Sequence, residues 1–96
     1  MNKITMTFEL LEQWITRPGQ PGEMLYWANP NREKPDTAAH VYESLGKWEW
    51  YAFPPAATQA TSMGRELTAL AAREAAMRAL LMIATGWPVR SGNGGA

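Results

Sequence analysis

The sequence predicts an α+β domain, in which a three-stranded antiparallel sheet packs on a long C-terminal helix and a shorter helix precedes the sheet. Three observations lead to this class. Residues 62–83 contain strong helix formers and no proline, residues 40–53 have the pattern of a β-hairpin, and residues 24–28 form a short aromatic run. We expect residues 1–86 to form this single domain, followed by a flexible, glycine-rich tail over residues 87–96.

The first segment, residues 1–16, fits two patterns. Apolar residues alternate along residues 3–10 as they would in a strand, whereas helical spacing relates Phe8, Leu11, Trp14 and Ile15. We predict a helix from Thr7 to Thr16, with Thr7 as its cap, because this interpretation places Trp14 and Ile15 on an apolar side. A strand over residues 3–10 remains the alternative.

A turn, a strand and a charged loop are expected next. Residues 17–22 combine two prolines with two glycines, which is typical of a turn, and residues 24–28 are short and aromatic, which is typical of a strand. Residues 29–39 carry two prolines and no apolar side chain larger than alanine, so we predict an exposed loop. Loops often carry binding residues, and the candidates here are Arg32, Glu33, Lys34 and Asp36.

Residues 40–53 predict a hairpin whose turn includes Gly46. With a tight turn, Val41 lies opposite Trp50, and Glu43 lies opposite Trp48. Side chains alternate between the two faces of a strand. One face then carries Val41, Trp48, Trp50 and Ala52, and the other carries His40, Tyr42, Lys47, Glu49, Tyr51 and Phe53. We expect the tryptophan face to pack on the long helix and the mixed face to meet water.

The long helix is predicted over residues 62–83, capped by Thr61 or Ser62 and ended by Gly86. Glu74 and Arg78 have the spacing of an ion pair along it. Apolar residues lie on more than one side, namely Met63, Leu67, Leu70, Ala71, Met77 and Leu81 on one side, and Ala69, Ala72, Ala75, Ala76, Ala79 and Ile83 on the other. The rest of the chain, or a partner, is expected to cover both sides.

Composition argues against several functions. The chain has no cysteine and one histidine, and it contains no nucleophile-elbow, phosphate-binding or dinucleotide-binding motif. We therefore predict no enzymatic activity, no metal and no cofactor. Nine basic and nine acidic residues cancel, which argues against direct binding of nucleic acid. No apolar run reaches the roughly 18 residues of a membrane span, and no signal peptide is evident, so we expect a cytoplasmic protein.

The last helix resembles the double-stranded-RNA-binding domain in the sequence Ala-Ala-Met-Arg-Ala-Leu at residues 75–80. The predicted order of helix, three strands and helix is similar to that family as well. The resemblance implies a similar fold and binding of double-stranded RNA. The family's phosphate-binding lysines are replaced here by Thr68, Ala69 and Ala72.

A second resemblance is compositional. A small cysteine-free chain with the strand sequence Lys47-Trp48-Glu49-Trp50 and an alanine-rich helix resembles the accessory proteins of phages and prophages. Among these are anti-CRISPR inhibitors, which bind a CRISPR effector complex and block its access to target DNA or its recruitment of a nuclease. This resemblance implies a host protein or protein–RNA complex as partner, in the cytoplasm of the host cell.

Together, these patterns predict a non-enzymatic protein-binding module. Five tryptophans in 96 residues, and aromatic side chains interleaved with charges, are typical of an interface. The predicted binding residues are Tyr42, Lys47, Glu49, Tyr51 and Phe53 of the hairpin, with Arg32, Glu33, Lys34 and Asp36 of the loop. The alternatives are a degenerate double-stranded nucleic-acid-binding domain, and a homo-oligomeric structural component of a virion or mobile element, for instance a homodimer through the alanine side of the helix.

Overall fold

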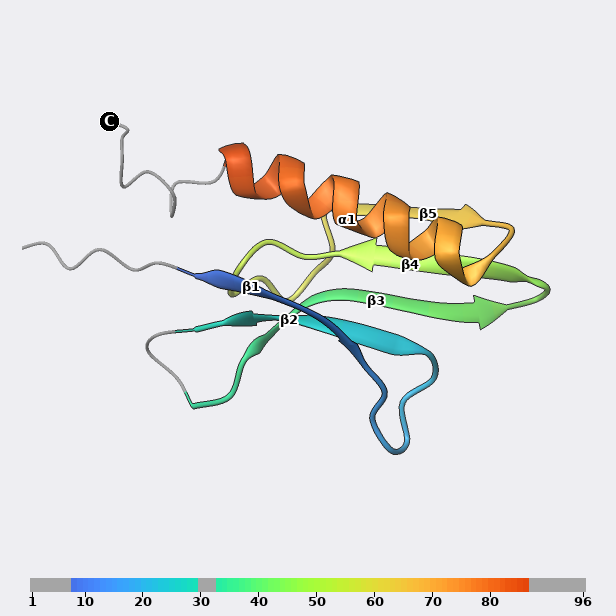
Figure 1. Cartoon of the computed structure of the whole chain (residues 1–96), viewed down its shortest axis with the longest axis horizontal. Helices are drawn as coiled ribbons and strands as arrows, with labels where there is room; N and C mark the ends of the chain where they lie inside the picture. The colour runs from blue at the N-terminus through green and yellow to red at the C-terminus, as the bar shows by residue number, and fades with distance from the viewer. Residues whose placement is uncertain (1–7, 30–32, 87–96) are drawn as a thin grey trace, which may run out of the picture.

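The computed structural model describes residues 8–29 and 33–86, and within them the fold is α+β. Five strands form one antiparallel sheet in the order of the chain, and α1 follows them and lies across β3, β4 and β5 (Figure 1). The elements are β1 (Glu9–Ile15), β2 (Glu23–Ala28), β3 (Asp36–Ser44), β4 (Lys47–Ala52), β5 (Ser62–Glu66) and α1 (Ala69–Gly86). The predicted class is therefore correct, while the predicted count of three strands is wrong.

The predicted hairpin is confirmed as β3 and β4. Val41 lies opposite Trp50, and Glu43 lies opposite Trp48. Its two-residue turn is Leu45-Gly46, and both residues adopt positive φ angles, of 55° and 81°. Such a turn matches the twist of the two strands that it joins, which fixes their register.

The predicted N-terminal helix is wrong, because residues 9–15 form β1. In a strand, backbone groups bond to β2, and Leu10 lies opposite Trp27. The pairing is irregular between Leu11 and Ile15, which face Tyr26 and Met24 respectively. Leu10 and Trp14, four residues apart in the strand, pack against the core on the side of α1, whereas Leu11 and Ile15 are 40% and 39% exposed. The helical spacing of Phe8, Leu11, Trp14 and Ile15 therefore did not mark a single apolar side.

The predicted start of the long helix is also wrong, because residues 62–66 form β5. The helix begins at Ala69, and the side chain of Thr68 caps it by accepting a hydrogen bond of 3.1 Å from the amide of Ala71. Neither Thr61 nor Ser62 is the cap. The outer edge of β4 offers backbone partners to this segment, and Gly64 is a poor helix former. Tertiary hydrogen bonding therefore overrides the local helical preference.

The predicted loop over residues 29–39 is shorter than expected. Asp36 is the first residue of β3 rather than a loop residue, and Ala38 and Ala39 are fully buried. Strand β2 provides the partner that extends β3 into this segment. Arg32 and the predicted tail over residues 87–96 lie outside the described residues.

The core lies between the sheet and α1. Leu25, Val41 and Leu80 are its largest fully buried side chains. As predicted, Trp48 and Trp50 pack against this core from β4. The alanine side of the helix is covered by the sheet, since Ala72, Ala75 and Ala76 are buried, whereas the other predicted side exposes Leu70 and Leu81.

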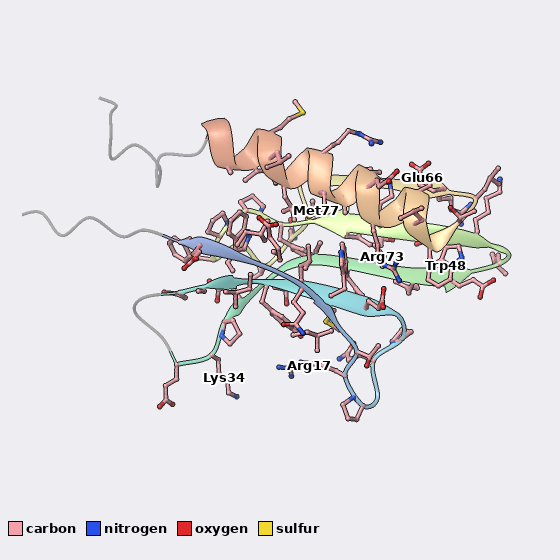
Figure 2. The ribbon with its side chains drawn as sticks, viewed as in Figure 1. Arg17, Lys34, Trp48, Glu66, Arg73 and Met77 are labelled. Carbon is pink, nitrogen blue, oxygen red and sulfur yellow. The ribbon has the colours of Figure 1, made fainter. Side chains whose placement is uncertain are left out.

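An ion pair ties the helix to the second strand. Arg73 of α1 contacts the carboxylate of Glu23 on β2 at 2.6 Å, and both side chains are only partly exposed. Figure 2 shows Arg73 directed from the helix toward the sheet. This contact ties α1 to β2, a strand outside the three that the helix lies across.

Candidate protein-docking surface

The face of the sheet turned away from α1, here called the open face, carries the candidate site. Strand register places its side chains in two rows that cross the sheet. One row contains Met24, His40, Tyr51 and Met63, and the other contains Tyr42, Glu49 and Arg65. Because residues that face each other in register share a face of the sheet, the two rows form one surface over β2 to β5.

Glu49 is the centre of a hydrogen-bond network on this surface. Its Oε1 accepts hydrogen bonds from the hydroxyls of Tyr51, at 2.7 Å, and Tyr42, at 3.2 Å. Its Oε2 accepts one from the guanidinium of Arg65 on β5, at 3.0 Å. The side chain of Glu49 is 14% exposed and that of Arg65 is 54% exposed, so the carboxylate lies beneath its partners. The network therefore holds both tyrosines in fixed positions.

These contacts shift two pKa values away from neutrality. The hydrogen bond from Tyr51, followed by that from Arg65, lowers the pKa of Glu49, and partial burial opposes this effect. Hydrogen bonding with Tyr42, followed by that to Glu49, raises the pKa of Tyr51 well above its usual range. A general acid or base works best with a pKa near the working pH. The network is thus suited to presenting fixed polar groups rather than to transferring protons.

The aromatic rings of the open face form a continuous strip. The ring centroids of His40 and Tyr42 are 4.9 Å apart, and those of Tyr42 and Tyr51 are 6.0 Å apart with the rings nearly parallel. The Nε2 atom of His40 lies 2.7 Å from the carbonyl oxygen of Pro21. Since a carbonyl oxygen can only accept, Nε2 carries the proton. The turn over residues 17–22, where sequence predicted it, thereby positions the histidine ring.

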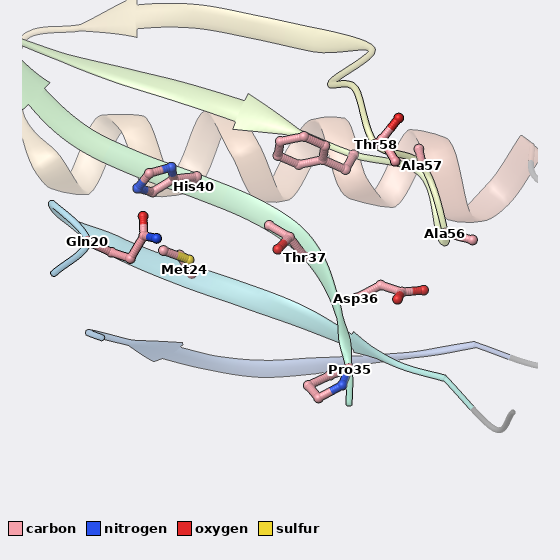
Figure 3. A pocket seen from close by; sticks show the side chains of 10 residues that line it. Gln20, Met24, Pro35, Asp36, Thr37, His40, Ala56, Ala57 and Thr58 are labelled. Carbon is pink, nitrogen blue, oxygen red and sulfur yellow. The ribbon is translucent and has the colours of Figure 1, made fainter. Parts of the chain in front are cut away.

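A hollow of about 530 Å³ lies at one end of the strip. Figure 3 shows it from the side away from the helix, with His40, Met24 and Thr37 along it. Phe53 and Asp36, both predicted binding residues, line the same hollow. The open face is therefore not flat, and a partner's side chain has a place to enter beside the aromatic strip.

The structure brings together only part of the predicted site. Tyr42, Glu49 and Tyr51 are in direct contact, and Phe53 and Asp36 line the adjoining hollow. Lys47 is exposed at the hairpin end of β4. Glu33 and Lys34 are exposed before β3, and Lys34 and Arg17, both labelled in Figure 2, line a smaller hollow.

Sequence reasoning missed several residues of the surface. Arg65 and Met63 were expected on a helix, so their place on the open face depended on finding β5. Met24 and Tyr26 lie two residues apart in a strand that was predicted, so their common face could have been inferred. The guanidinium of Arg17 lies 5.2 Å from the centroid of the Tyr26 ring, a cation–π contact between the turn and β2.

Comparisons with protein-family models, with curated proteins and with solved structures give no match to this chain. Within residues 8–29 and 33–86, no three His, Asp or Glu side chains are grouped so that they could hold a metal ion. In the same residues, no helix has the length and apolar character to cross a bilayer. The element order of the described residues, five strands and then a helix, differs from the helix, three strands and helix that sequence suggested for a double-stranded-RNA-binding domain.

Proposed function

We propose that this chain is a non-enzymatic protein-binding module that docks another protein on the open face. The observation that supports this most directly is the aromatic strip of His40, Tyr42 and Tyr51, whose two tyrosines are held by Glu49, on a sheet face that the helix leaves free. Tyrosine and arginine are enriched at the centres of interfaces, and ordered side chains lose little entropy on binding.

The charges of the open face favour a protein over a nucleic acid as partner. Phosphate binding depends on cations that can replace counterions. On this face Arg65 is paired with the carboxylate of Glu49, and Asp36 lines the adjoining hollow. The competing proposal is a degenerate double-stranded nucleic-acid-binding domain. It predicts an affinity for nucleic acid that falls steeply as the salt concentration rises.

In its sharper form, the proposal names the partner as a bacterial CRISPR effector complex, whose access to target DNA or recruitment of a nuclease the chain would block. This form is supported by the compositional resemblance to phage accessory proteins and by the neutral net charge. It places the protein in the cytoplasm of the host cell, with a protein or protein–RNA complex as its partner.

The test is a pull-down with the tagged 96-residue chain from a bacterial lysate that contains CRISPR effector complexes, treated with nuclease and washed at high salt. We expect a stoichiometric effector complex to remain bound. Affinity for the purified complex should then fall about 30-fold or more in Tyr51→Ala, as expected of an interface hot spot worth about 2 kcal/mol. Leu81→Ala, an exposed apolar change on the far side of α1, is the matched control and should leave affinity unchanged.

Three results would contradict the proposal. Nucleic acid retained alone and released by high salt would favour the nucleic-acid alternative. Equal affinities of Tyr51→Ala and Leu81→Ala for a bound complex would place docking elsewhere on the molecule. Absence of any effector complex from the eluate would reject the CRISPR form, and the docking role would then require a different protein partner.

A further inference from the structure

The two edges of the sheet differ in how they are protected. The outer strands are β1 and β5. Strand β1 is irregular between Leu11 and Ile15, and an irregular edge resists pairing with another strand. Strand β5 pairs with β4 in unbroken register over all of Ser62–Glu66 and contains neither proline nor lysine. Its outer edge is thus a regular template for another strand.

Apolar surface borders the β5 edge on both faces of the sheet. On the open face, Met63 is 61% exposed. On the helix face, a groove of about 510 Å³ runs between β5 and α1, where Trp50, Ala79 and Met82 line it, and Met82 is 74% exposed. A strand added to this edge would cover both regions while it pairs with the backbone.

We propose that the strand added here is β5 of a second copy of this chain, antiparallel to the first, so that two five-stranded sheets join into one. Gly64 is the middle residue of β5, and a two-fold axis through it pairs every residue of the strand. Ser62 then lies opposite Glu66 of the second copy, and Met63 lies opposite Arg65 of the second copy. Both members of each pair share a face of the sheet, as a flush antiparallel ladder requires.

The chemistry of these pairs is self-complementary. The serine hydroxyl can donate to the glutamate carboxylate of the second copy, and the aliphatic stem of Arg65 can cover the exposed methionine. A register centred on Arg65 would place two guanidinium groups opposite each other. A register centred on Met63 would leave Arg65 and Glu66 outside the paired strands. The middle register is therefore favoured both by charge and by the number of backbone bonds.

The proposed contact differs from the one that the alanine side of the helix suggested. Ala76 is fully buried against the sheet of its own chain, so a self-contact there would require opening the core. Pairing through β5 leaves each core intact and joins the two open faces into one surface. It does not depend on the docking role, since the dimer can form whatever the open face binds.

Sedimentation equilibrium over a concentration series tests the proposal, with two substitutions of the same exposed residue. Met63→Lys places an ammonium group opposite Arg65 of the second copy, and Met63→Glu places a carboxylate there. We expect a wild-type dimer, a dissociation constant raised about tenfold or more in Met63→Lys, and one within about threefold of wild type in Met63→Glu. Because Met63 is exposed in the single chain, the thermal midpoints of the monomeric forms should agree.

A cysteine pair tests the register. Met63→Cys and Arg65→Cys chains should form a disulfide-linked dimer when mixed under oxidising conditions. Neither should do so efficiently alone, because two copies of the same position are not opposite each other in this register, and the chain has no other cysteine. A wild-type chain that remains monomeric at all concentrations would overturn the proposal. A dimer that Met63→Lys and Met63→Glu weaken equally, or not at all, would overturn it too, since neither result fits an arginine opposite residue 63.

Discussion

The indole of Trp50 on β4 lies directly over the backbone of Gly64 on β5. A β carbon at Gly64 would lie 2.8 Å from the indole Nε1 and 2.9 Å from Cε2, closer than side chains pack. The same indole N–H donates a hydrogen bond of 3.2 Å to the carboxylate of Glu66. The absence of a side chain at Gly64 therefore sets how closely the tryptophan can cover the last strand.

Gly64→Ala is expected to destabilise the fold by about 1–3 kcal/mol, because the added methyl group must displace the indole. Urea unfolding monitored by circular dichroism measures the change, and Leu67→Ala, at a 77% exposed residue that follows the strand, should stay within about 0.5 kcal/mol of wild type. Combining Gly64→Ala with Trp50→Leu should cost less than the sum of the two single changes. Additive costs would mean that the two residues are not in contact.

Leu80→Ala and its neighbour Leu81→Ala should differ sharply in stability. Leu80 is fully buried against the sheet, so its truncation should cost about 2–5 kcal/mol, whereas Leu81 is 56% exposed and should cost less than about 0.5 kcal/mol. Chemical denaturation of both variants measures the difference. Similar costs would contradict the helix orientation described above.

Thr68→Ala should destabilise the protein by about 1 kcal/mol, because the hydroxyl that caps the amide of Ala71 is lost. Thr61→Ala is the matched control, at the residue where the sequence placed the cap, and should change the free energy of unfolding by less than about 0.5 kcal/mol. A larger loss of stability in Thr61→Ala than in Thr68→Ala would instead favour the longer helix that the sequence predicted.

Glu49→Gln should lower stability at neutral pH and have less effect in acid. The pKa of Glu49 is lowered from its usual 4.5, so its ionised form stabilises the folded state above that pH, and this contribution is lost as the pH falls through the lowered folded-state pKa. The thermal midpoints of wild type and variant, measured from neutral pH into acid, should therefore converge as the pH falls below 4.5 toward the lowered pKa. A difference that is constant with pH would show that the carboxylate charge is not involved.

The hydroxyl of Tyr51 should stay protonated at a pH where an ordinary tyrosine ionises. Its pKa is raised above 10.0 by its contacts with Tyr42 and Glu49, so the ultraviolet titration curves of wild type and Tyr51→Phe should coincide as the pH passes through 10.0. One additional tyrosine ionising in wild type by that pH would contradict the network. Binding that depends on the Tyr51 hydroxyl should accordingly persist through the neutral range.

The open face could be predicted from the sequence only where local patterns determined it. The alternation of side chains along residues 40–53 and the Leu45-Gly46 turn placed Tyr42, Glu49 and Tyr51 on one face, and the register agrees. Arg65, which completes the network, could not be assigned because its segment has the composition of a helix. The hollow next to His40 lies between segments that are distant in the sequence, so no local sequence pattern predicts it.

By itself, then, the sequence determined the α+β class, the β3–β4 register and the C-terminal helix as far as Gly86, because each depends on contacts between residues close along the chain. Tertiary structure alone decided that residues 9–15 and 62–66 are strands. Both segments have helical spacing or composition, but each lies beside a strand whose backbone groups need partners, and the bonds formed there outweigh a local preference of a few tenths of a kcal/mol per residue.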